Sequence, residues 1–169
     1  MNIFYLHPDP IVCAKMHNDK HVVKMILEYA QMLSSAHRTY SPEGWADEAG
    51  LPKIGRHYNH PQTKWVRANK SNYLWLYSLF RALLNEYYYR YGYKQNRRHH
   101  HEVYLLDLTD PPKNIPHGEW FEPPQCMPDI FKDDCVITAY RKYYQYAKAS
   151  FNKWTRRMEP DWLSEKIPL

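Results

Sequence analysis

The sequence is poor in two residue types that mark common protein classes. It has only five glycines and three cysteines among 169 residues, against 13 prolines. Scarce glycine with plentiful proline favours helices joined by stiff, irregular connections over a repetitive β fold. The cysteines, Cys13, Cys126 and Cys135, are odd in number and form no CxxC pair, which predicts reduced thiols and argues against a disulfide framework.

Targeting and membrane segments are also lacking. The opening MNIFYLHPDP has neither the basic region nor the long apolar core of a signal peptide. No apolar run reaches the roughly 18 residues that span a bilayer. We therefore expect a cytoplasmic protein without membrane contact. Glycine-rich phosphate loops and GxSxG elbows are missing too, and we predict no cofactor.

What the sequence does have is aromatic residues and positive charge. It contains 16 tyrosines, six tryptophans and five phenylalanines, and its net charge is +5. Basic and aromatic residues alternate in KWVRANKSNY, YRKYY and NKWTRR, a texture that suits phosphates and exposed bases. The other explanation is that the rings fill the core and the cations are merely solvated. The candidate DNA contacts are Lys24, Lys64, Arg67, Lys70, Arg141, Lys142, Arg156 and Arg157.

Hydrophobic periodicity predicts three principal helices in one compact, mainly α domain that spans residues 1–169. The first runs from about Asp19, a plausible N-cap, to residue 35 or 37, and the second from Ser71 to a stop at Gly92. The third begins near residue 133 and stops before Pro160. Residues 38–70 and 93–132 are predicted to be long irregular loops rich in proline and histidine, and residues 1–6 to be a short extended, buried segment.

The first of these helices carries a narrow polar stripe. At about 100° per residue, its polar side chains fall within an arc roughly 80° wide on a helix otherwise suited to burial. The stripe consists of His21, Lys24, Glu28, Gln31 and Ser35. An ordinary solvated face is one interpretation. The other is that the stripe lines a cleft, with His21 and Glu28 facing it together.

The histidines suggest a metal site only weakly. His57 and His60 lie in GRHYNHPQ, and His99, His100 and His101 are consecutive. Consecutive side chains diverge unless the backbone bends, and no HExxH or Cys/His cluster is present. We predict no metal, and a metal-dependent nuclease that uses these histidines is the least favoured alternative.

One segment carries a resemblance to a known family. DKHVVKMILE resembles the active-site helix of the phage-type pyrimidine-dimer DNA glycosylases, the endonuclease V family, through Asp19, His21, Val22, Val23 and Glu28. The segments LHPDP and YNHPQTKWVR are similar to the LHP and NHPQ segments of bacterial members. The aromatic second helix and the tryptophan-rich end follow in the same order. The host cell cytoplasm is the implied location if a phage encodes the protein.

The resemblance implies a helical fold in which the α-amine of the chain lies near the glutamate of the first helix and attacks the sugar C1′ of a lesion, forming an imine. Glu28 takes the carboxylate role, and His21 the neighbouring polar position. Such an amine has an ordinary pKa of about 7.7–8.0, against about 10.4 for lysine, so more of it is nucleophilic at neutral pH. Asn2 is expected to leave Met1 in place, so the nucleophile is the Met1 amine, or a lysine such as Lys24, or is absent.

The sequence thus predicts a DNA glycosylase and AP lyase acting on a damaged or modified base, in duplex DNA. Leu27 and Gln31 stand where the resemblance leads us to expect arginines that contact phosphates, so the kind of lesion stays open. The alternative is a non-catalytic nucleic-acid-binding protein on the same scaffold, with His21 and Glu28 as a structural pair. Oligomeric state is open as well.

Overall fold

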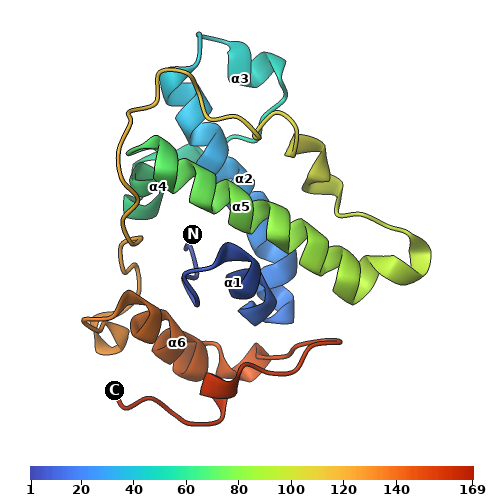
Figure 1. Cartoon of the computed structure of the whole chain (residues 1–169), viewed down its shortest axis with the longest axis vertical. Coiled ribbons are helices and arrows are strands. Elements are labelled where there is room, and N and C mark those ends of the chain that lie inside the picture. The colour runs from blue at the N-terminus through green and yellow to red at the C-terminus, as the bar shows by residue number, and fades with distance from the viewer.

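The computed structural model describes residues 1–169 and is built entirely from helices and irregular connections. Figure 1 shows the six α-helices in their chain order. They are α1 (Pro10–Met16), α2 (Asp19–Tyr40), α3 (Trp45–Glu48), α4 (Pro61–Val66), α5 (Lys70–Tyr87) and α6 (Val136–Ala147). None of them combines the length and the apolar character needed to cross a membrane. The predicted mainly α class is confirmed.

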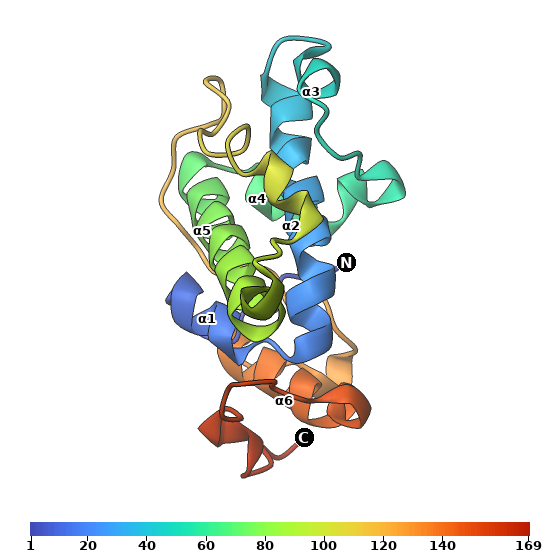
Figure 2. The ribbon, with the colours of Figure 1, turned by 90° about the vertical axis from the view of Figure 1, so that its right-hand side faces the viewer.

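The core is centred on the crossing of α2 and α5. Both helices bury a broad apolar face, with Ile26, Leu33, Leu76 and Phe80 fully enclosed. Figure 2 shows α1 on one side of α5, and α2 with the amino terminus on the other. α6 lies below this crossing and closes the core with Ala139, Tyr140 and Tyr144.

The first two predicted helices are confirmed, with refined ends. α2 begins at Asp19, but its N-cap is Asn18, whose side chain accepts a hydrogen bond from the His21 amide at 2.9 Å. α2 continues to Tyr40, beyond the predicted end. α5 begins at Lys70 after the Asn69 N-cap and passes into a π-helical turn, Tyr88–Gly92, so the stop at Gly92 is confirmed.

The prediction for the third helix is wrong at its C-terminal end. α6 stops at Ala147, and a short 3-10 turn, Ala149–Phe151, follows. The chain then leaves the helix axis because residues 152–155 attach to the start of α2. The Asp19 amide donates to the Lys153 carbonyl at 2.8 Å, and the buried Trp154 ring donates to the Met16 carbonyl at 3.1 Å.

The prediction that residues 38–70 form a loop is also wrong in part. This stretch contains α3, a 3-10 turn (Gly55–Asn59) and α4. His60 caps α4 and Pro61 occupies its first position, a combination typical of a helix start that periodicity misses in a six-residue helix. Residues 93–132 contain only the short turns Tyr93–Gln95, His100–Tyr104 and Asp129–Phe131, as the repeated prolines predict.

Candidate active site

The site is built around the extended amino-terminal segment, which has no partner strand. Buried backbone groups must be paired, and here side chains from the helices pair them. The Gln62 side chain of α4 accepts a hydrogen bond from the Ile3 amide and donates one to the Ile3 carbonyl at 3.3 Å. The Tyr29 hydroxyl of α2 accepts a hydrogen bond from the Phe4 amide at 3.2 Å. Ile3 and Phe4 are almost fully buried, as predicted for residues 1–6. The position of Met1 is therefore fixed by the helices around it.

This anchoring brings the chain's α-amine to the polar stripe of α2. The Met1 nitrogen lies 4.0 Å from Glu28 Oε2, and Lys24 Nζ lies 3.3 Å from Glu28 Oε1. The Met1 side chain is buried and accepts a weak hydrogen bond from Thr63 Oγ1 at 3.7 Å, whereas the Lys24 side chain is 63% exposed. The Glu28 carboxylate thus lies between two primary amines, the Met1 α-amine and the exposed Lys24 side chain.

His60 and Cys126 complete the surroundings of the amine. Burial lowers the pKa of His60, the positive charges of the α-amine and His57 lower it further, and Glu28 opposes these effects. These effects favour the neutral form of the His60 imidazole, on which the charges of both Met1 and Glu28 act. Burial raises the pKa of the Cys126 thiol, and the positive charge of the α-amine partly opposes this shift.

Gln62 joins these segments into one framework. Its amide nitrogen donates to the Pro124 carbonyl at 3.0 Å and to the Tyr140 hydroxyl, and that hydroxyl accepts from the Cys126 amide at 3.3 Å. The amino terminus, α4, α6 and the proline-rich connection thus meet at one buried amide. The sequence analysis did not include Gln62 or His60 in the site, although both lie in the NHPQ segment that carried part of the resemblance.

His21 lies elsewhere on the stripe. It stands two turns before Glu28 on α2, and its ring stacks on Phe4 with centroids 4.1 Å apart. His21 Nδ1 is 2.6 Å from the Tyr144 hydroxyl, and burial drives the pKa of His21 far below its usual range. None of its hydrogen bonds involves Met1 or Glu28. The structure brings Met1, Glu28 and Lys24 together, and holds His21 in an aromatic cluster beside them.

A family model described as pyrimidine dimer DNA glycosylase matches residues 1–101 of the 169. The chain belongs to this family. No curated protein and no solved structure matches the chain at a comparable level. The matched residues include the amino-terminal segment, α2, α4 and α5, and with them Met1, Glu28 and Gln62. The proposed site of this DNA glycosylase family member therefore lies inside the matched part, while α6 lies outside it.

The cations that precede α5 are partly free. Lys64 and Lys70 are exposed and form no ion pair, whereas Arg67 stacks on the Tyr58 ring at 3.9 Å and donates to the Tyr58 carbonyl at 2.6 Å. Lys24 is exposed beside Glu28. Of the predicted DNA contacts in the matched region, these three lysines are available to phosphates.

The other four predicted contacts have separate partners. Arg141 donates to the Leu6 carbonyl at 3.0 Å, and Lys142 is buried with its Nζ 2.9 Å from Asp133 Oδ2. Arg156 and Arg157 follow the end of α6 and contact the end of α5 and the turn after it, through Tyr89 and Glu86. The structure does not bring these four cations together on one exposed face.

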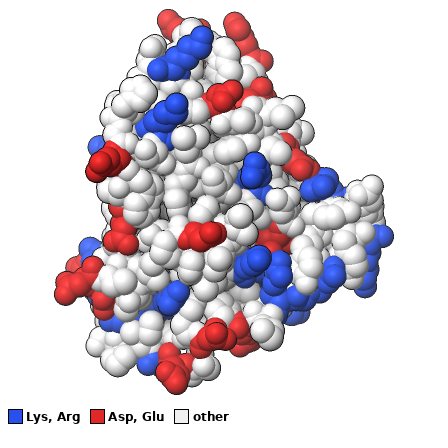
Figure 3. Space-filling model, viewed as in Figure 1, with Lys and Arg blue, Asp and Glu red and all other residues white.

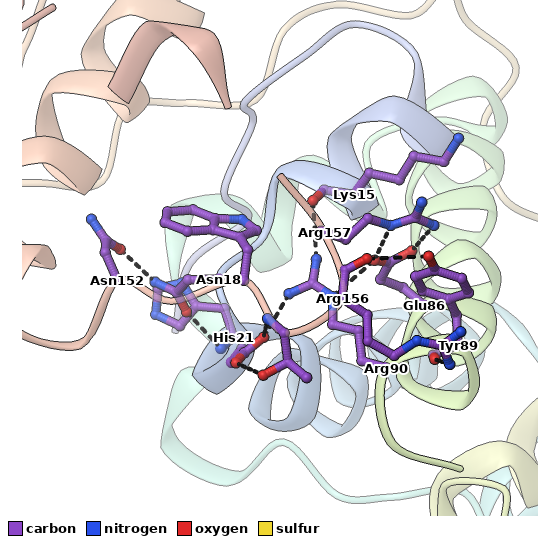
Figure 4. A network of polar contacts seen from close by, with 12 residues as sticks. Lys15, Asn18, His21, Glu86, Tyr89, Arg90, Asn152, Arg156 and Arg157 are labelled. Atoms are coloured by element: carbon purple, nitrogen blue, oxygen red, sulfur yellow. Dashed lines mark hydrogen bonds and ion pairs between the residues drawn. The ribbon is translucent and has the colours of Figure 1, made fainter. Parts of the chain in front are cut away.

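Arg157 belongs to the ion-pair network shown in Figure 4. Glu86 of α5 accepts from Arg157 through both carboxylate oxygens, at 2.8 and 2.9 Å, and from Arg90 Nε at 2.8 Å. Arg90 also contacts Asp19 Oδ1 at 3.0 Å. The two cations and two carboxylates of this network give it no net charge. Their contacts join α2, α5 and the C-terminal segment. No group of three or more His, Cys, Asp or Glu side chains has the geometry to hold a metal ion.

Proposed function

We propose that this protein is a DNA glycosylase and AP lyase that removes a damaged or modified base from duplex DNA through an imine on the Met1 α-amine. The observation that carries the proposal is the 4.0 Å approach of the Met1 nitrogen to the Glu28 carboxylate. A primary amine next to a proton acceptor is the pair that imine chemistry requires. Membership of the pyrimidine dimer DNA glycosylase family supports the same reaction class.

The proposed reaction begins when Glu28 takes a proton from the amine. The neutral nitrogen attacks C1′ of the sugar, and the glycosidic bond breaks with its electron pair leaving on the base. The nitrogen loses a second proton to water, and the C1′–O4′ bond opens with its electrons on O4′. Protonated Glu28 gives its proton to O4′, which restores the carboxylate, and an iminium joins C1′ to Met1.

The strand is cut in the second stage. Removal of a C2′ proton, again by Glu28, expels the 3′ phosphate by β-elimination, and water then hydrolyses the imine to release the amine. Glu28 thereby moves protons at two steps, and the nearby Lys24 cation stabilises its charged form in between.

Access to C1′ requires a nucleotide to leave the stack, which costs a few kcal/mol and least for a damaged base. Lys24, Lys64 and Lys70 are the exposed cations that we propose to hold the flanking phosphates. Replacing one contacting lysine should reduce the slope of log affinity against log salt by about 0.9 for B-form DNA.

Borohydride trapping on duplex DNA with an abasic site tests the mechanism, because reduction turns the imine into a stable amine. The cross-linked protein is digested, and mass spectrometry identifies the peptide that carries the sugar. We expect the adduct on the Met1 nitrogen. An adduct on Lys24 instead would support the glycosylase activity but show that Lys24, and not Met1, is the nucleophile.

Two controls make the result decisive. The Lys24→Gln variant keeps the α-amine, and should still trap, whereas acetylation of the amino terminus should abolish trapping. If the unmodified protein traps on no damaged or abasic duplex and yet binds duplex DNA, the glycosylase proposal fails and the DNA-binding alternative takes its place.

A further inference from the structure

A second positive region lies on the opposite side of the molecule from Met1 and Glu28. Figure 2 shows the amino terminus on the α2 side and α1 on the far side of α5. Between α1 and the C-terminal half of α5 is a cavity of about 400 Å³. Its lining includes three cations, Lys15, Arg81 and Arg157.

The charge in this cavity is not balanced. Its only carboxylate, Glu86, is 4% exposed and already bonded to Arg90 and Arg157. Lys15 and Arg81 are exposed and form no ion pair. Arg157 directs Nε and Nη2 to Glu86, which leaves its Nη1 donors unused. Two free cations and one fixed guanidinium edge therefore face an opening with no available acidic group, which suits a phosphate.

The positive surface continues beyond the cavity over an aromatic platform. The Arg156 guanidinium lies over the Tyr93 and Tyr89 rings, at 3.6 and 4.5 Å, and Arg98 lies over Tyr88 at 4.3 Å. In Figure 3 the blue side chains gather at the lower right, over the end of α5 and the connection that follows it. Residues 81–98 contain five basic residues and one acidic residue.

The backbone of this platform is held in two uncommon conformations. α5 ends in the π-helical turn Tyr88–Gly92, and Arg156 has a φ of 60°, in the left-handed region. Its Nη1 donates to the Tyr89 carbonyl at 2.7 Å, and the Tyr89 hydroxyl donates to the Arg156 carbonyl at 3.1 Å. π-helical turns and left-handed non-glycine residues persist where the surrounding contacts impose them, and both are frequent at functional sites.

We propose that the α1–α5 cavity and the Arg156 platform form a second site that binds the phosphate backbone of duplex DNA. This inference rests on the proposed function for its choice of polyanion. A free phosphate ion would need only the cavity. Arg156 and Arg98 add positive charge outside the cavity, and this extended series of cations fits the successive phosphates of a DNA strand. Because α1 and the amino terminus lie on opposite sides of α5 (Figure 2), one chain can hold two duplex segments at once.

The test compares two variants of the full chain that lose the same charge. Lys15→Gln with Arg81→Gln alters the cavity, and Lys113→Gln with Lys166→Gln removes two exposed lysines elsewhere. Binding of undamaged duplex is measured by fluorescence anisotropy over a series of salt concentrations. We expect the cavity variant to lose about 1.8 from the log–log slope, two contacts at about 0.9 each, and the control to lose much less.

Stoichiometry provides an independent readout. Sedimentation of the unsubstituted chain with a short duplex should show two duplexes per chain, and the cavity variant should retain one. Equal slopes for the two variants, or a single duplex in both, would overturn the proposal. If inorganic phosphate binding, followed by calorimetry, is lost in the cavity variant while its DNA slope is unchanged, the cavity is a free-phosphate site and the DNA assignment is wrong.

The two proposals fail separately. Trapping on abasic DNA with the unsubstituted chain reports only on Met1 and Glu28. Loss of trapping with a normal slope difference would reject the glycosylase and keep the second site, and the reverse result would reject only the second site.

Discussion

At the scale of single residues, Glu28 is distinguished by its partners. It is half-buried on α2, and both of its ion-pair partners are primary amines, Met1 and Lys24. Neither partner is a buried cation that depends on Glu28 for compensation, because Lys24 is exposed and the Met1 nitrogen lies at 4.0 Å. We therefore expect the fold to depend little on the charge of Glu28.

We predict that Glu28→Gln lowers excision and strand cleavage by about 10²–10⁴, the range for a positioned acid or base. DNA affinity should stay similar or rise slightly, because a negative charge leaves a surface near phosphates. Single-turnover cleavage and anisotropy measure the two effects. A melting temperature that falls with no activity in either protein would mean that Glu28 is structural.

Buried histidines give the fold a pH dependence. Burial lowers the pKa of His17 and of His37 to about 4, and that of His21 further still. Each pKa is below the unfolded value of about 6.5, so stability is complete above pH 6.5 and is lost as pH falls toward the folded pKa.

We therefore expect the free energy of unfolding to fall between pH 6.5 and 4, by up to about 1.4 kcal/mol per pH unit for each buried histidine. His37→Gln should make this dependence shallower, and the exposed His117→Gln should leave it unchanged. Urea unfolding at a series of pH values measures the slopes. Equal slopes in the two variants would contradict the role of His37.

At the scale of elements, the extended amino-terminal segment depends on α4. Gln62 is fully buried and pairs both polar groups of Ile3, which lies two residues from the α-amine. A six-residue helix thus acts as the support that holds the amino terminus against α2.

Gln62→Ala should lower the free energy of unfolding by about 1–3 kcal/mol, because it leaves the buried amide and carbonyl of Ile3 without a partner. Trapping should slow as well, because Met1 loses its fixed position. Gln31→Ala removes a single exposed hydrogen bond to the Lys53 carbonyl and should change stability by less than about 0.5 kcal/mol. Thermal melts and trapping rates of both variants test this, and unaltered trapping in Gln62→Ala would refute the supporting role.

At the scale of the whole molecule, buried ion pairs hold the C-terminal segment against the core. Arg90 is fully buried, and with Glu86 it connects Asp19 at the start of α2 to Arg157 near the end of the chain (Figure 4). The Asp19 carboxylate also accepts from the Thr155 amide at 2.9 Å. These contacts hold α5 and the region after α6 against the first long helix.

Glu86→Gln should lower the free energy of unfolding by about 3–5 kcal/mol, because Arg157 then loses its only carboxylate partner and the buried Arg90 keeps only Asp19. Asp47→Asn, which breaks an exposed pair with Arg38, should cost less than about 1 kcal/mol. Chemical unfolding gives both values, and limited proteolysis should cut Glu86→Gln first near residues 155–160. A cost below 1 kcal/mol for Glu86→Gln would show that the network adds little stability.

The sequence by itself determined the helical class, α2 and α5, because their apolar spacing and their caps are local properties of the chain. Glu28 and Met1 were predicted as a pair through the family resemblance, since no local pattern relates an amino terminus to a glutamate 27 residues away. Tertiary structure decided the end of α6, where Trp154 and Lys153 bind the start of α2 instead of extending a helix. It also separated His21 from Glu28: the two share one face of α2, but Phe4 and Tyr144 arrive from distant segments and cover only His21. Periodicity fixes the direction in which a side chain points from its helix, whereas burial depends on which other segment packs against it.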